Sequence, residues 1–127
     1  MRYVIDTDVL IWVLRRDSGA VQWIETIARS GTLGCSVLTV AEILRLIRDY
    51  ELPRARRFFE SLDSIPVTFE DAVRAAEMMR NRGPSLVDCH IAAAAIRLGA
   101  TVITYNRKDF ARTGAALVDR PSMPGRP

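Results

Sequence analysis

Short apolar runs alternate along the whole chain with stretches of helical period, and this alternation limits the fold more than any other feature. The runs are almost continuously apolar, as expected of parallel strands that are buried on both faces. Helices placed between such strands form right-handed crossovers, which keep the strands parallel. We therefore expect an α/β fold with a five-stranded parallel sheet, formed by residues 2–5, 33–37, 65–68, 101–104 and 117–118.

The segments between these runs carry helix signals at their ends. Thr39 and Glu42 have the spacing of a capping box, so we expect a helix to begin there. Ser85 can cap the clearest helix of the chain, and Gly99 can end it. Helices that flank the sheet are expected over residues 7–16, 20–30, 39–49, 53–62, 69–82 and 85–98.

The size and composition of the chain fit one soluble domain. Its 127 residues, 49% of them hydrophobic, can bury an ordinary core. We expect the domain to cover residues 1–119, and residues 120–127, which include three prolines, to form a flexible tail. No run approaches the roughly 20 apolar residues of a membrane span, and no charged leader precedes an apolar segment, so a cytoplasmic location is expected. The net charge of +3 is compatible with a nucleic-acid substrate but does not identify one.

Acidic residues follow the predicted strands or begin the helices beyond them. Asp6 comes directly after the first strand, and Asp109 follows the fourth. Glu42 and Asp88 are expected in the first turns of their helices, where the helix dipole stabilises a carboxylate. The carboxyl ends of parallel strands share one edge of a sheet, where ligands bind in such folds. Because carboxylates brought together repel one another, the cluster predicts a divalent-metal site and a metal-dependent phosphodiesterase.

Each acidic residue also has a purely structural interpretation. Glu42 and Asp88 could serve only as cap partners at the starts of their helices. Asp8 could brace the turn after the first strand, and Asp109 could be an ordinary first-turn acid of a short helix. The coincidence of four segments, and not any single residue, favours the metal site.

The four segments together resemble the PIN-domain nucleases, and most closely the VapC-type toxins of prokaryotic toxin–antitoxin pairs. Each motif is weak alone, whereas all four in this order and at these separations are typical of the family. They extend from the first predicted strand to Phe110. The matching motifs are VIDTD (4–8), LTVAE (38–42), LVDCHIAA (86–93) and TVITYNRKDF (101–110).

The resemblance implies a single Rossmann-like PIN domain that cleaves single-stranded or structured RNA with Mg²⁺ or Mn²⁺. Thr104 would brace the site or position the attacking water. Many members of the family carry a fourth acid where this chain has Asn106. Asn106 could bind a metal through its carbonyl, or Asp109 could supply the missing charge, so the site could hold one metal or two. By position, the acidic metal-site residues are Asp6, Glu42 and Asp88.

The sequence also offers candidate contacts for substrate and partners. Arg107 and Lys108 flank the proposed site and could hold RNA phosphates, with a solvated face as the equal alternative. VapC-type toxins form homodimers and accept a segment of a cognate antitoxin, so the resemblance implies both partners. Large aromatic side chains on helices are more often core than contact, yet four of them could build the antitoxin groove: Trp12, Trp23, Phe58 and Phe59.

Two other functions compete with a nuclease. In a haloacid-dehalogenase-like phosphatase, Asp6 would be a covalent nucleophile and Asp8 an acid–base group. However, Leu10 stands where that class needs threonine or valine, Lys108 falls too late for the catalytic lysine, and no acidic pair follows it. The third interpretation is a PIN-like module that binds RNA or a partner without catalysis, and Asn106 is the one residue that favours it.

Overall fold

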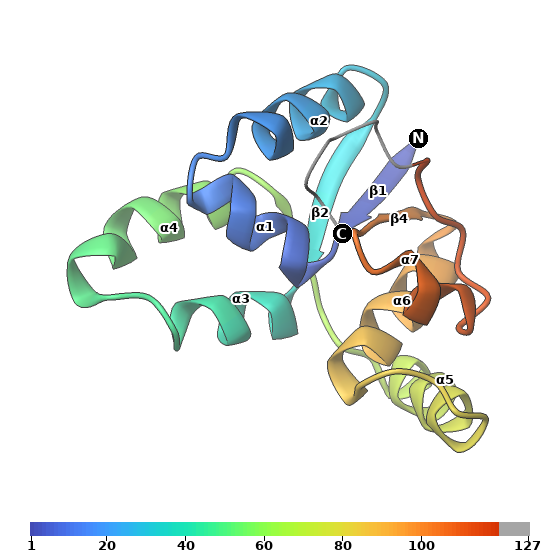
Figure 1. The fold of residues 1–127 in the computed structure, drawn as a ribbon. Coiled ribbons are helices and arrows are strands. Elements are labelled where there is room, and N and C mark those ends of the chain that lie inside the picture. The colour runs from blue at the N-terminus through green and yellow to red at the C-terminus, as the bar shows by residue number, and fades with distance from the viewer. Residues whose placement is uncertain (120–127) are drawn as a thin grey trace.

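One parallel sheet forms the centre of the molecule (Figure 1). The structure is a computed structural model and describes residues 1–119. Within them, β1 (Arg2–Ile5) lies between β2 (Thr32–Ser36) and β4 (Thr101–Ile103), and β3 (Asp63–Ile65) forms an edge beside β2. All the pairings are parallel, which confirms the predicted α/β class.

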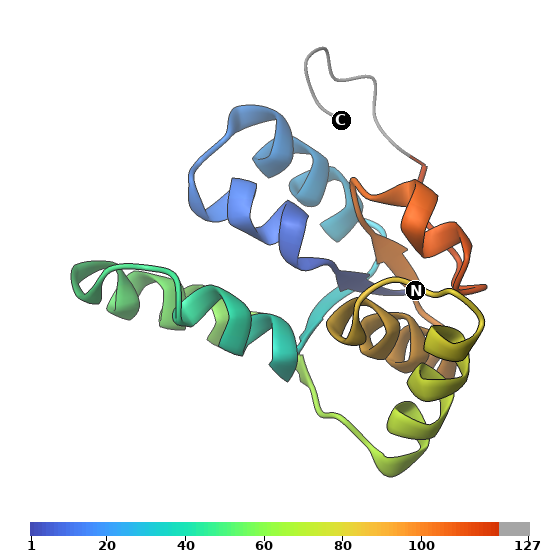
Figure 2. The same ribbon diagram turned by 60° about the horizontal axis from the view of Figure 1, so that its bottom comes forward.

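Helices connect the strands and cover both faces of the sheet (Figure 2). The six predicted helices are present, with their ends shifted by a few residues, and two short helices lie outside these six ranges. The bounds are α1 (Thr7–Leu14), α2 (Ser18–Ala28), α3 (Val37–Leu44), the 3-10 helix η1 (Asp49–Glu51), α4 (Leu52–Glu60), α5 (Phe69–Arg80), α6 (Leu86–Leu98) and α7 (Arg107–Ala111).

Two apolar cores lie on opposite faces of the sheet, because neighbouring residues of a strand point to opposite sides. Ile5 and Ile103 belong to the core formed with α1, α2, α3 and α4. Val4 and Val102 belong to the core formed with α6 and α7. The structure favours the core interpretation of the four large aromatic side chains: two lie in the first core and two, partly buried, pack against it, namely Trp23 and Phe59, and Trp12 and Phe58.

The sheet has four strands in the described residues, not the five that we predicted. Residues 117–118 pair with β4 through a single parallel bridge, between Leu117 and Val102. The N–H of Val118 donates to the carbonyl of Val102 at 2.9 Å, and the N–H of Val102 donates to Ala116 at 2.8 Å. The predicted segment is only two residues long, which is shorter than the usual strand and limits it to these bonds.

The end signals of α6 act as the sequence predicts, whereas the predicted end of β3 does not. The hydroxyl of Ser85 accepts the backbone N–H of Asp88 at 3.2 Å and caps α6. Gly99 ends α6 in the left-handed conformation, with φ of 63°, which favours glycine. However, β3 ends at Ile65 and not at residue 68, because Pro66 has no N–H to donate to a sheet.

The predicted flexible tail, residues 120–127, lies outside the described residues and stays a prediction. No helix within residues 1–119 is long and apolar enough to cross a membrane. What matters for function is the edge of the sheet where the strands end, since Asp6 follows β1 and Thr104 follows β4 at that edge.

Candidate functional site

Asp6 lies at the carboxyl end of β1 and is almost fully buried, with 3% of its surface exposed. It is the N-cap of α1, and one of its carboxylate oxygens accepts the backbone N–H of Thr7 at 2.7 Å. The other oxygen accepts the hydroxyl of Thr104 at 2.7 Å. Thr104 is itself fully buried and accepts the N–H of Asn106 at 2.9 Å. Thr104 therefore braces both Asp6 and the turn after β4.

Glu42 reaches the same edge of the sheet from α3. The helix begins at Val37 after the N-cap Ser36, which places Glu42 in the second turn and not the first. The predicted capping box with Thr39 is therefore wrong. Instead, Oε1 of Glu42 accepts the hydroxyl of Thr7 at 2.9 Å, across the interface between α1 and α3. The helix dipole acts mainly within the first turn, so it contributes little to Glu42.

Asp88 approaches from α6, where it lies in the first turn as predicted. Burial raises the pKa of Asp88 above its ordinary value, and repulsion from Asp8, Glu42 and Asp109 raises it further. Repulsion of this kind acts only over short separations in a protein. The three predicted acidic segments and the one after β4 are therefore brought together around Asp88.

Asp8 also belongs to this cluster, although the sequence favoured a bracing role for it. Burial raises the pKa of Asp6, and repulsion from Asp8 and Asp88 adds to the effect, so that it reaches about 9. Burial raises the pKa of Asp8 as well. Its Oδ1 atom is buried and has no hydrogen-bond partner among the described residues. The sequence did contain a signal for Asp8. It stands two residues after Asp6, the N-cap of α1, so both side chains lie at the same end of that helix.

Asn106 and Asp109 form a pair of their own at the start of α7. The side-chain amide of Asn106 donates to Oδ2 of Asp109 at 2.9 Å, and Arg112 donates to Oδ1 at 2.7 Å. These contacts with Asn106 and Arg112 lower the pKa of Asp109. Asp109 is thus a partly neutralised acid, in contrast to Asp6 and Asp88.

The two basic residues that we predicted to hold RNA phosphates have different surroundings. Arg107, the first residue of α7, donates a hydrogen bond to the carbonyl of Val118. Lys108 is exposed and has no ion-pair partner within residues 1–119. Lys108 can therefore meet a substrate directly, whereas Arg107 would first have to leave Val118.

The donor atoms of the cluster suit a hard divalent cation, because carboxylate oxygens are the ligands that Mg²⁺ and Mn²⁺ prefer. Within residues 1–119, no three His, Cys, Asp or Glu side chains converge closely enough to hold a metal ion as they stand. The cluster therefore fits a cation by charge and by donor type. In the same part of the chain, no ion pair to Lys or Arg neutralises Asp6, Asp8, Glu42 or Asp88.

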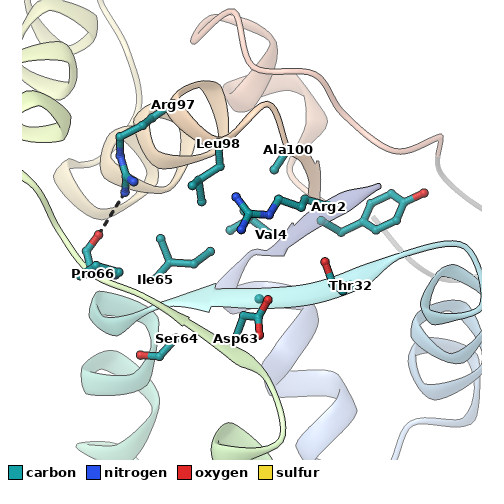
Figure 3. A pocket seen from close by; sticks show the side chains of 12 residues that line it. Arg2, Val4, Thr32, Asp63, Ser64, Ile65, Pro66, Arg97, Leu98 and Ala100 are labelled. Atoms are coloured by element: carbon teal, nitrogen blue, oxygen red, sulfur yellow. Dashed lines mark hydrogen bonds between the residues drawn. The ribbon is translucent and has the colours of Figure 1, made fainter.

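A hollow of about 400 Å³ lies on one face of the sheet (Figure 3). Arg2, Thr32 and Asp63 line it, and these are the first residues of β1, β2 and β3. The acidic cluster lies at the opposite ends of the strands. The hollow is therefore not part of the candidate site.

Known proteins share both the sequence pattern and the fold. The model of the PIN domain family matches residues 3–116. Ribonuclease VapC10 from Mycobacterium tuberculosis is 35% identical over 77 residues, which are 61% of this chain and 58% of that protein. The match thus spans little more than half the length of this curated relative.

Two solved structures extend the likeness over most of the chain. VapBC2 from Rickettsia felis, bound to a promoter DNA fragment, has a chain that matches with a TM-score of 0.77 at 20% identity, covering 94% of this chain and 98% of that one. A toxin–antitoxin complex from Klebsiella pneumoniae gives a TM-score of 0.76 at 26% identity, with 86% and 90% covered. Since the family model includes every segment of the acidic cluster, the chain belongs to the PIN-domain family.

Proposed function

We propose that this chain is a metal-dependent endoribonuclease and the toxin component of a type II toxin–antitoxin system. The observation that carries the proposal is the group of mutually repelling carboxylates delivered by β1–α1, α3 and α6. Keeping such charges together costs free energy unless a cation binds among them. The name Ribonuclease VapC10 and the toxin–antitoxin complexes among similar structures support the same function.

In this proposal, Mg²⁺ or Mn²⁺ binds with one or two ions per site. Asn106 is a better fourth ligand than Asp109, because the Asp109 carboxylate is already engaged by Arg112 and by Asn106 itself. A bound cation supplies acidity for the attacking water and positive charge beside the phosphate. The residues that hold the metal are proposed to be Asp6, Glu42 and Asp88.

Neighbouring residues of the chain orient these ligands. Thr104 uses its hydroxyl hydrogen for Asp6 and a lone pair for the N–H of Asn106, which favours bracing over the positioning of water. His90, the single histidine, lies with Nδ1 2.8 Å from the carbonyl of Leu86 within α6, so we assign it no catalytic role. We propose that exposed Lys108 contacts RNA phosphates.

The proposed antitoxin site is a groove of about 530 Å³ between α1 and the arm formed by α3, η1 and α4. Aliphatic side chains such as Ile11 and Leu46 line it, each four residues after a residue of the site, Thr7 and Glu42 respectively. A partner segment with apolar and acidic side chains would match this surface and end near the acidic cluster. The cationic side chains of the groove are Arg15, Arg16, Arg48 and Arg54.

A homodimer, which the family resemblance implies, and a cytoplasmic location, which the sequence predicts, complete the proposal. A second groove, of about 550 Å³, is lined by apolar side chains of α3 and by Phe59 of α4, with the charged Arg56 and Glu60 beside them, and offers a face for another copy. Size-exclusion chromatography with light scattering measures the oligomeric state, and a strictly monomeric chain at micromolar concentration would contradict the dimer.

The nuclease itself is tested by incubating the purified chain with RNA and Mg²⁺. We expect cleavage that EDTA blocks and that Asp6→Ala or Asp88→Asn lowers by at least about 100-fold. Asp63→Asn is the matched control, because Asp63 is exposed at the opposite ends of the strands. Phosphate release from small monoesters without RNA cleavage would favour the phosphatase, and RNA binding without cleavage would favour the binding module.

A further inference from the structure

A chain of hydroxyl groups connects Glu42 to the interior of the molecule. The hydroxyl oxygen of Thr7 lies 2.9 Å from Oε1 of Glu42 and 3.1 Å from the hydroxyl oxygen of Thr39. Thr7 is the first residue of α1, whereas Thr39 and Glu42 are on α3. The contacts therefore join two helices that are more than thirty residues apart in the sequence.

The direction of these hydrogen bonds follows from the chemistry of the groups. A hydroxyl carries one hydrogen, and an ionised carboxylate only accepts. Thr7 is the donor in both contacts, and its single hydrogen favours the charged Glu42 oxygen over the neutral hydroxyl of Thr39. A hydrogen bond to a charged acceptor is stronger than one between neutral groups, so the carboxylate end of this chain is the stronger contact.

Within residues 1–119, the hydroxyl of Thr7 is the one hydrogen-bond donor to the Glu42 carboxylate. It lies in the second turn of α3, so it has no first-turn backbone N–H to accept from. Within residues 1–119 it forms no ion pair. Thr39 is fully buried, so its hydroxyl stays fixed inside the packed interface of α1 and α3. Thr7 thus links the Glu42 side chain, at the surface of the site, to the rigid core.

We propose that Thr7, held by Thr39, is a positioning residue that orients the Glu42 carboxylate toward the divalent metal. The inference rests on the proposed function, because it assigns Glu42 to the metal. Groups that hydrogen-bond to metal ligands restrict their orientation, and losing such a group commonly weakens metal binding. Thr7 itself has no contact with the metal in this proposal.

The test is calorimetric titration of Mn²⁺ into the full chain, compared among variants that differ at Thr7. Thr7→Val keeps the shape but removes the hydroxyl, so we expect Mn²⁺ affinity to fall about 10-fold. Thr7→Ser keeps the hydroxyl and is expected to bind within about twofold of the unchanged chain. Thr39→Val, which frees the Thr7 hydroxyl, is expected to give a smaller loss. Melting in EDTA checks that each variant is folded.

A double-mutant cycle with Glu42→Gln separates positioning from a direct effect. If Thr7 acts through Glu42, Thr7→Val causes no further loss of Mn²⁺ affinity in the Glu42→Gln background. Losses that multiply in the double variant would overturn the proposal, as would equal affinities of Thr7→Val and the unchanged chain. If the unchanged chain binds no Mn²⁺ at all, the proposed function fails, and the two failures are thereby distinguished.

Discussion

Asp6 is a carboxyl group buried among other acids, and its charged form is unfavourable in the absence of a cation. Burial, with repulsion from Asp8 and Asp88, raises its pKa from 3.8 to about 9. A folded chain without metal therefore keeps a proton that the unfolded chain releases above about pH 4. The stability from this proton is complete below pH 3.8 and is lost as the pH rises through 9.

We predict that stability in EDTA decreases between pH 5 and pH 8, and that Asp6→Asn reduces this decrease. The contribution of Asp6 is at most about 1.4 kcal/mol per pH unit. Urea unfolding at several pH values measures the slope. Asp63→Asn is the control, because Asp63 is exposed at the opposite ends of the strands, away from Asp6. Equal slopes for Asp6→Asn and the unchanged chain would contradict this account of Asp6.

Asn106 provides a second prediction at this scale. If its side chain contacts the metal, Asn106→Asp adds a negative charge to the ligand set, and we expect Mg²⁺ affinity to rise by about tenfold, equivalent to roughly 1.4 kcal/mol. The readout is the Mg²⁺ concentration at half-maximal stabilisation of the fold. An unchanged midpoint would remove position 106 from the site.

Spacing in the sequence predicted which acids meet but not how each is held. Asp6 follows β1, and Asp88 follows Ser85, the cap of α6, so the placement of both depends on local signals. The bond from Thr7 to Glu42 crosses the interface of α1 and α3. Such a contact depends on how two helices pack, and no local pattern records it.

At the scale of elements, an ion pair joins α5 to α6. Arg97 donates to both carboxylate oxygens of Asp71, at 2.8 and 2.9 Å, and Asp71 is almost fully buried. Asp71 also completes a capping box with Thr68. Burial alone would raise the pKa of Asp71, but the hydrogen bonds from Arg97 and Thr68 outweigh it and lower the pKa. The pair fixes α6, the helix that carries Asp88.

We predict that Asp71→Asn lowers the free energy of unfolding at pH 7 by roughly 2–4 kcal/mol, because Arg97 loses its charged partner. The stabilisation by Asp71 is present above its ordinary pKa of 3.8 and is lost as the pH falls below it, so the variant and the unchanged chain converge in acid. Arg112→Ala breaks an exposed pair and should cost less than about 1 kcal/mol. Equal losses for the two variants would contradict a structural role for Asp71.

Local signals also explain which element boundaries could be predicted. Ser85 and Gly99 bound α6 without competition. At α3, two residues could cap, and Ser36 does so while Thr39 becomes core. The buried Thr39 contacts Thr7 of α1, and the sequence does not show this contact between two helices.

At the scale of the whole molecule, the parallel sheet brings distant parts of the chain to one edge. Alternation of strands and helices predicted this arrangement, and with it the meeting of Asp6, Glu42 and Asp88. The fifth predicted strand is the exception, because in the described residues it is a single bridge between Leu117 and Val102. The topology of the sheet explains why the acidic residues lie at one edge. The bound metal is inferred from their charge and needs its own test.

Anomalous diffraction from a crystal of this chain soaked in Mn²⁺ tests that claim most directly. We predict an anomalous peak within coordination distance of carboxylate oxygens of both Asp6 and Asp88. In crystals of Asp88→Asn, the peak should weaken or disappear. A crystal at saturating Mn²⁺ with no peak between Asp6 and Asp88, or with its peak elsewhere on the molecule, would contradict the account.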